Sequence, residues 1–129
     1  MRQIRFRAWD RVKKVLYLDP FNGRIGKLNE TFSYPGNWDY MQFTGLKDKN
    51  GEDIYEGDIV DYSGLGSKSQ FAIKYFPEYG CWGMDKKGKP VGRGGSSTKY
   101  EPYFMSKYHL NKMTVIGNIY ENPDLVGEK

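Results

Sequence analysis

Six acidic side chains crowd residues 48–61, near the middle of the chain. Carboxylates gathered in this way can hold magnesium for phosphodiester chemistry, so a metal-dependent nuclease is one hypothesis. Their spacing does not match a calcium-binding loop, which repeats its acidic ligands and ends in glutamate. Turn and solvated-surface roles explain most of them, and we predict no metal site; joint mutation of Asp48 and Asp58 tests the nuclease hypothesis. The six residues are Asp48, Glu52, Asp53, Glu56, Asp58 and Asp61.

Other catalytic patterns are incomplete. Cys81 and His109 are the only cysteine and histidine, and they lie far apart with no flanking motif that would pair a nucleophile with a base. Residues 83–89 have the spacing of a phosphate-binding loop, but Pro90 stands where a serine or threonine hydroxyl must bind magnesium. We therefore predict that the protein is not an enzyme, with no catalytic residues and no cofactor.

Basic residues interleaved with aromatic ones are a stronger signal. Lysine and arginine neutralise phosphates and aromatic rings stack on bases, so this combination indicates a nucleic-acid surface. Arginine stacked on tryptophan is also an ordinary way to cover the face of a sheet, which is the competing interpretation. The predicted nucleic-acid contacts are Arg5, Arg7, Trp9, Lys86, Lys87, Lys89 and Arg93.

The net charge of +4 hides an uneven distribution. Residues 41–62 carry a net charge of −4, between residues 1–40 at +4 and residues 63–100 at +5. The acidic block could pair with the basic blocks within a subunit or between subunits, or the basic blocks could form a face for a polyanion. Since the blocks largely cancel, +4 is weak evidence for a polyanion partner.

Composition also bears on location. No apolar run approaches the roughly 20 residues that span a bilayer, so we predict no membrane association. The first residues alternate charged and apolar side chains and lack the apolar core of a secretory signal. A single cysteine in 129 residues agrees with a reducing compartment. The sequence therefore predicts a cytoplasmic protein.

The elements that must position these residues are short strands. Aromatic residues make up 16% of the chain, and glycine and asparagine mark frequent turns, which favours an all-β barrel or sandwich. Asn50-Gly51 and Gly57-Asp58 are the clearest turns. Residues 21–39 are predicted to be mostly loop and residues 85–98 irregular and mobile, while residues 103–113 contain at most one short helix. The predicted strands are 4–9, 15–18, 40–44, 70–76, 81–84 and 114–120.

Three segments together resemble a known family. They are IRFRAWD at residues 4–10, MQFTGLKDKNGEDIYEGDIV at residues 41–60 and VIGNIYENP at residues 115–123. In order and spacing they are similar to the YopX family, small proteins of bacteriophages and prophages found mainly in Gram-positive bacteria. The middle segment is the most specific of the three.

The resemblance implies a mainly β fold with a small SH3-like barrel, built from the Gly57-Asp58 turn onward and closed by the C-terminal strand. The N-terminal strands form an attached β portion, so that one domain of residues 1–129 divides into residues 1–40 and the barrel portion of residues 41–129. Asp10 is expected to form a turn. The expected packing residues are Trp9, Phe43, Tyr55 and Tyr120.

The family carries no established activity, so function is inferred from the residues. A small core and segregated charge favour a phage accessory protein that is not an enzyme, forms a homo-oligomer, and binds a host or phage macromolecule. The alternative hypothesis is a nucleic-acid-binding β-barrel. The metal-dependent nuclease is the third.

Overall fold

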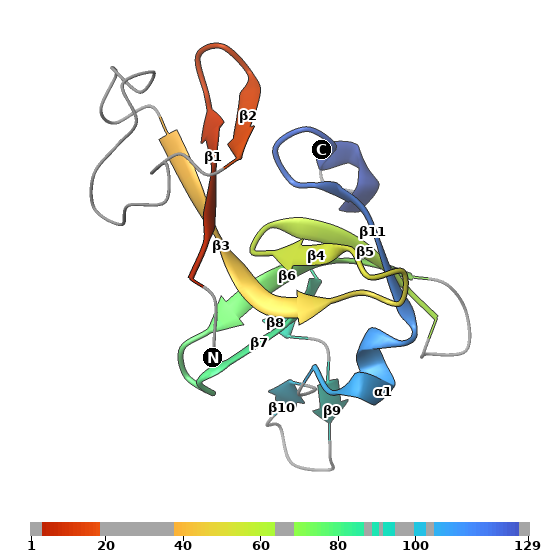
Figure 1. The fold of residues 1–129 in the computed structure, drawn as a ribbon. Coiled ribbons are helices and arrows are strands. Elements are labelled where there is room, and N and C mark those ends of the chain that lie inside the picture. Colours follow the sequence, from red (N-terminus) through yellow and green to blue (C-terminus); the bar gives the residue numbers. More distant parts are fainter. Residues whose placement is uncertain are drawn as a thin grey trace.

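The structure is a computed structural model, and its fold is mainly β (Figure 1). Two antiparallel sheets dominate it, and the only helical segments among the described residues are α1 (Lys107–Leu110) and the 3-10 turn η1 (Pro123–Val126). The predicted fold class is confirmed. No helix in the described part of the chain is long and apolar enough to span a membrane. The structure describes residues 4–18, 38–63, 69–86, 89–90, 92–94, 100–102 and 105–126.

The first sheet has the strand order β2-β1-β3-β4. The expected turn at Asp10 is confirmed: Asp10 Oδ1 accepts the N–H groups of Val12 and Lys13, and this turn joins β1 to β2. β3 is long enough to pair with β1 at one end and β4 at the other. It runs through residues 40 and 41, where the sequence suggested a division between the N-terminal portion and the barrel portion. The strands are β1 (Phe6–Asp10), β2 (Val15–Leu18), β3 (Trp38–Lys47) and β4 (Asp53–Tyr55).

The second sheet has the order β11-β5-β6-β7-β8 and curls into a half barrel (Figure 1). Its inner face packs a core that includes Ile54, Tyr62, Ile73, Met84 and Met113. A separate pair joins β9 (Gly92–Gly94) to β10 (Tyr100–Pro102). The strands of the half barrel are β5 (Asp58–Tyr62), β6 (Ser69–Phe76), β7 (Cys81–Lys86), β8 (Lys89–Pro90) and β11 (Met113–Asn118).

A smaller cluster holds the two sheets together. Trp9 stacks on Tyr120, with ring centroids 6.0 Å apart, and Phe43 lies 5.3 Å from Tyr55. Met41 belongs to the same cluster and is 1% exposed. The four aromatic residues expected to pack are thus confirmed as packing residues.

Two local predictions are confirmed and two are corrected. Gly51 and Gly57 have φ values of +81° and +87°, the left-handed backbone that their turns require. The stretch 85–98 was expected to be irregular, but β7 continues through Lys86 and pairs with β8, and β9 follows. Pairing with β6 and β8 overrides the loop-like composition there. Residues 21–39 were expected to be mostly loop; residues 38 and 39 instead begin β3, where they pair with β1, and residues 21–37 lie outside the described residues.

Candidate functional site

Arg7 and Asp58 form a buried ion pair between the two sheets. Arg7 Nη2 donates to Asp58 Oδ1 at 2.5 Å, and the side chains are only 12% and 1% exposed. The guanidinium also lies 4.1 Å above the Tyr55 ring. Asp58 Oδ2 accepts the Tyr55 N–H at 2.8 Å because the turn at Gly57 folds Asp58 back onto the end of β4. Both carboxylate oxygens are therefore engaged.

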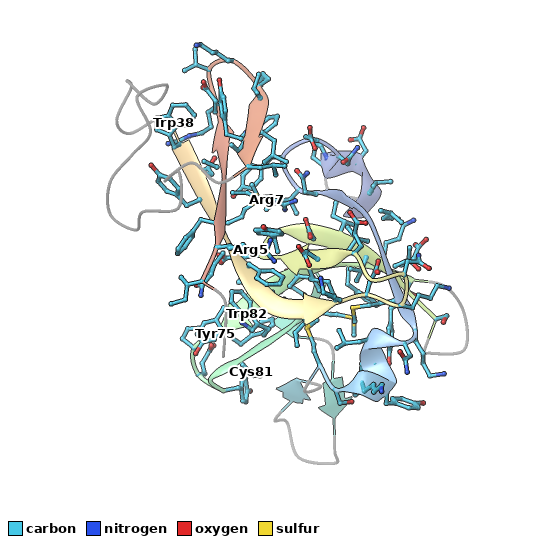
Figure 2. All side chains as sticks on the ribbon, in the orientation of Figure 1. Arg5, Arg7, Trp38, Tyr75, Cys81 and Trp82 are labelled. Atoms are coloured by element: carbon cyan, nitrogen blue, oxygen red, sulfur yellow. The ribbon has the colours of Figure 1, made fainter. Side chains whose placement is uncertain are left out.

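Arg5 makes a second, more exposed contact of the same kind. Arg5 Nη2 lies 3.0 Å from Asp53 Oδ2, and its guanidinium lies 4.1 Å above the Phe43 ring. Lys47 Nζ donates to the other oxygen of Asp53. We call Arg5, Arg7, Asp53 and Asp58 the arginine seam. Figure 2 shows both arginines directed from the N-terminal strand toward the space between the sheets.

The two carboxylates of the arginine seam differ electrostatically. Burial raises the pKa of Asp58, and the nearby Arg7 charge offsets only part of that effect. The hydrogen bond from Lys47, followed by that from Arg5, holds the pKa of Asp53 below its ordinary value despite partial burial. A carboxyl group with a raised pKa is a candidate acid or base, but the Asp58 oxygens already accept internal donors. The Arg7–Asp58 pair therefore joins the two sheets, and the Arg5–Asp53 pair ties the start of the chain to β4 within the first sheet.

The acidic residues that suggested a metal site are separated by their folding contacts. Asp48 Oδ1 accepts the N–H groups of Asn50 and Glu52, and Oδ2 accepts the N–H of Val115 on β11. Among the residues that the structure describes, no three histidine, cysteine or acidic side chains lie close enough to hold a metal ion. Asp48 is thus the centre of a loop that attaches to β11.

The residues considered for nucleophilic chemistry lie on different elements. His109 is in α1, with Nδ1 3.0 Å from Ser106 Oγ and its ring 6.1 Å from the ring of Tyr62. Cys81 begins β7, and burial raises the pKa of its thiol, which lowers the thiolate fraction at neutral pH. Neither environment activates a nucleophile.

The predicted nucleic-acid contacts divide into two groups. Arg5 is held by Asp53 within the first sheet, whereas Arg7 and Trp9 make contacts from the first sheet to Asp58 on β5 and to Tyr120 after β11. Lys87 lies outside the described residues. Lys86, Lys89 and Arg93 lie in β7, β8 and β9, where the structure describes the backbone alone. Their contact with nucleic acid stays a prediction.

Large apolar side chains are exposed on the β1–β2 hairpin. Leu18 is 72% exposed, Val12 65% and Val15 40%. The sequence predicted a strand at residues 15–18 but not the exposure of its apolar side chains. The available signal was the unbroken apolar run Val-Leu-Tyr-Leu, because an edge strand that faces water on one side normally alternates apolar and polar residues.

A second exposed apolar feature lies on the β6–β7 hairpin. Tyr75 and Trp82 are opposite one another in the register, and their rings meet edge to face with centroids 5.1 Å apart (Figure 2). Tyr75 is exposed, whereas Trp82 also packs against the core of the half barrel.

Comparison with known proteins identifies the family. The family model described as YopX protein matches residues 22–127. The chain belongs to the YopX family. The resemblance inferred from the sequence is therefore confirmed. Comparison with curated proteins gives no match.

A solved structure resembles this YopX protein over almost its whole length. The crystal structure of protein EF1440 from Enterococcus faecalis is 26% identical in sequence, with a TM-score of 0.63. The similarity covers 98% of this chain and 99% of that one. It supports the arrangement of both sheets.

The family match covers the half barrel and its attached loop but not the N-terminal hairpin. The Asp48 loop and the Gly57-Asp58 turn lie inside residues 22–127, so the YopX model includes the half barrel and its attachment. Arg5, Arg7 and the hairpin that carries Leu18 precede residue 22. In this YopX protein, the most exposed apolar element thus lies before the matched range.

Proposed function

We propose that this YopX-family chain is a phage or prophage accessory protein that is not an enzyme, forms homo-oligomers, and binds a host or phage macromolecule in the bacterial cytoplasm. The observation that carries the proposal is the exposure of three apolar side chains on the β1–β2 hairpin, at Val12, Val15 and Leu18. Exposed apolar side chains grouped on one element are typical of protein–protein contact sites. The side chains capable of chemistry are instead used in folding contacts.

The distribution of charge supports a protein partner over a polyanion. Acidic and basic residues are equal in number within the described ranges, so the net charge of +4 comes from the remainder of the sequence. Arg7 is already paired with Asp58 of the half barrel, and Arg5 with Asp53 of the first sheet. Apolar contact therefore explains more of the described surface than phosphate binding does.

Self-association is tested by sedimentation velocity over a concentration range of about 5 to 500 µM. The expected result is a mass that rises from monomer toward an oligomer as concentration increases. A monomer throughout that range contradicts the self-association in the proposal. A pull-down with purified phage or host candidates then tests the macromolecular partner separately.

Nucleic-acid binding is the second candidate, favoured by exposed Tyr75 next to exposed Lys74 on β6. Fluorescence anisotropy with labelled single- and double-stranded DNA and RNA distinguishes the two. Binding at about 50 mM salt that weakens steeply as salt increases supports this candidate. Absence of binding at about 50 mM salt excludes it and leaves a protein partner.

A further inference from the structure

Asp48 holds the loop between β3 and β4 through both its side chain and its backbone. Its Oδ1 accepts the N–H groups of Asn50 and Glu52, at 2.8 and 2.9 Å. Its backbone carbonyl accepts the Gly51 N–H at 3.0 Å, and its backbone N–H donates to the Glu52 carbonyl at 2.9 Å. We call residues 48–52 the Asp48 loop. The backbone N–H groups of its last three residues are thus all bonded to Asp48.

The Asp48 loop also covers the outer edge of β11. Asp48 Oδ2 accepts the Val115 N–H at 2.9 Å, and the Lys49 N–H donates to the Met113 carbonyl at 3.2 Å. Both groups on β11 lie at the edge of the half barrel, where no further strand in the described part of the chain pairs with them. A change in the backbone of the loop would therefore reach β11.

Asn50 and Gly51 form a sequence that can deamidate. Asn50 is exposed, and Asp48 bonds its backbone N–H rather than its side chain. Gly51 has φ +81°, and a Cβ built on it would meet nothing within 4 Å. Because glycine has no side chain, residue 51 presents no atoms of its own that obstruct the approach of its backbone nitrogen to the Asn50 side chain.

Deamidation rearranges the bonds between these two residues. The Gly51 nitrogen attacks the side-chain carbonyl carbon of Asn50, and ammonia leaves with the proton of that nitrogen, which closes a succinimide ring. Water then breaks one of the two bonds from the ring nitrogen to a carbonyl carbon. Breaking the bond to the former side-chain carbon gives aspartate. Breaking the bond to the former backbone carbon gives isoaspartate, whose chain contains one additional carbon. The only reactant besides the chain is water.

We propose that Asn50 is a site of spontaneous deamidation, that opening of the Asp48 loop sets its rate, and that the isoaspartate product detaches the loop from β11. In the closed loop the Gly51 N–H donates to the Asp48 carbonyl, so the nitrogen that must attack Asn50 is held in a hydrogen bond. Local opening of the loop releases it. The additional carbon of isoaspartate then displaces Gly51 and Glu52 from their acceptors on Asp48, whose side chain loses its fixed position against β11.

The reaction is measured in one peptide. Trypsin cleavage after Lys49 and Lys68 releases residues 50–68, in which Asn50 is the only asparagine and no glutamine occurs. Mass spectrometry of this peptide after incubation at mildly alkaline pH follows Asn50 alone, and chromatography separates aspartate from isoaspartate. The folded wild type is expected to react at least about 10-fold more slowly than the chain in urea. In urea, Gly51→Ala is expected to slow the reaction at least about 10-fold, because its Cβ obstructs the nitrogen.

Two variants separate opening of the loop from unfolding of the whole chain. Asp48→Asn weakens the loop itself, whereas Arg7→Met removes the cation buried beside Asp58, in a different part of the fold. Urea denaturation first establishes that both variants are folded under the incubation conditions. We expect Asp48→Asn to react at least about 5-fold faster than the folded wild type and Arg7→Met to stay within about 2-fold of it.

A third measurement tests the product. Ion exchange separates the deamidated chain, because it gains a negative charge. Hydrogen exchange of the Val115 amide is expected to be at least about 10-fold faster in the isoaspartate form than in the wild type, since that amide loses its bond to Asp48. Asn50→Asp is the matched control, with the same added charge on an ordinary backbone, and should stay within about 3-fold of the wild type.

Each outcome supports or overturns one part of the proposal. The expected order of rates, with Asp48→Asn faster than Arg7→Met, supports control by the loop. Equal rates in the folded and denatured wild type, or a larger increase in Arg7→Met, overturn that control. Unchanged exchange of the Val115 amide in the isoaspartate form overturns the detachment of the loop. A residue 50–68 peptide that gains no mass even in urea overturns the site itself.

Discussion

The outermost strands β11 and β2 differ in how their open sides are treated. Asp48 and the Lys49 N–H occupy the outer side of β11, and a bulge interrupts its register. β2 has a continuous register and exposed apolar side chains. An edge strand left unprotected in a folded protein is a ready template for another strand. The edge of β11 is thus closed by the Asp48 loop, whereas no strand among the described residues pairs with the outer edge of β2.

One ion pair of the arginine seam, Arg7–Asp58, connects these two regions. Arg7 crosses from β1 to Asp58 at the start of β5, and Arg5 crosses to Asp53 on β4. Because the contacts begin on the hairpin strand, they fix the orientation in which β2 is presented. We therefore expect substitutions at Asp48, in the arginine seam and at Gly57 to lower the free energy of unfolding by different amounts.

The largest loss of stability is expected at Asp48, whose carboxylate bonds to the outer edge of β11. Asp48→Ala leaves the N–H groups of Asn50, Glu52 and Val115 without their acceptor in a buried site, and we expect a loss of about 4 kcal/mol in the free energy of unfolding. Asp48→Asn keeps one carbonyl oxygen and should lose about half as much. Urea denaturation measures both.

Glu52→Ala is the matched control in the same loop, because its side chain is exposed and its hydrogen bonds with Asp48 use only the Glu52 backbone N–H and carbonyl. It should change stability by less than about 0.5 kcal/mol. A similar loss for Asp48→Ala and Glu52→Ala would show that the carboxylate does not close the edge of β11.

The second largest effect is expected in the arginine seam. Arg7→Met keeps much of the packing but leaves Asp58 buried without its cation, which should cost about 3 kcal/mol at neutral pH. Arg11→Met is the control, because Arg11 is on the hairpin turn and its pair with Asp39 is exposed. Urea denaturation should find Arg11→Met within about 0.5 kcal/mol of wild type.

The pH dependence of Arg7→Met provides a second readout. Loss of Arg7 should raise the pKa of Asp58 further, so Asp58 protonates more readily in the folded chain than in the unfolded chain. The stability of the variant then falls as pH rises from the unfolded-state pKa of Asp58 through its higher folded-state pKa. The loss in free energy of unfolding of Arg7→Met relative to wild type should therefore be smaller near pH 4 than at pH 7. Adding Asp58→Asn should recover part of the loss at pH 7. A deficit independent of pH would mean that Arg7 acts only through packing.

Sequence reasoning succeeded where the determinants are local. The turns at Asn50-Gly51 and Gly57-Asp58 depend on glycine's access to positive φ, and the Asp10 turn depends on donors two and three residues away. Such contacts can be inferred from neighbouring residue types. The family resemblance in turn indicated which aromatic residues pack.

The contacts of the arginine seam and of Asp48 with β11 could not be inferred from neighbouring residue types. Asp48 meets Val115 across 67 positions of sequence, and Arg7 meets Asp58 across 51. Without knowledge of these contacts, Asp48 and Asp58 looked like candidate metal ligands. Mutating both to test for a nuclease would instead remove two structural carboxylates. Loss of any activity would then follow from unfolding.

A smaller effect is expected in the turn that leads from one sheet to the other. Gly57→Ala forces an L side chain to adopt φ +87°, which should cost about 1 kcal/mol. A Cβ there would lie 3.5 Å from Met41 Sδ, an ordinary contact, so no additional steric loss is expected. Gly51→Ala, with φ +81° and nothing within 4 Å, is the control and should lose a similar amount in urea denaturation. A much larger loss for Gly57→Ala would reveal tight packing against Met41.

The smallest effect is expected at the exposed end of the arginine seam, and its pH dependence has the opposite sign to that of Asp58. The pKa of Asp53 is lowered in the folded chain, so ionised Asp53 contributes stability above its unfolded pKa, and this contribution is lost as pH falls through the folded pKa. Because Arg5 and Lys47 are well exposed, Asp53→Asn should cost only about 0.5 kcal/mol at pH 7 and nothing near pH 2. Thermal unfolding of the wild type and of Asp53→Asn between pH 2 and pH 7, at low and high salt, measures the difference in stability between them. A stability difference between wild type and Asp53→Asn that grows toward acid pH would mean that the pKa of Asp53 is raised by folding. Both carboxylates of the arginine seam would then have raised pKa values.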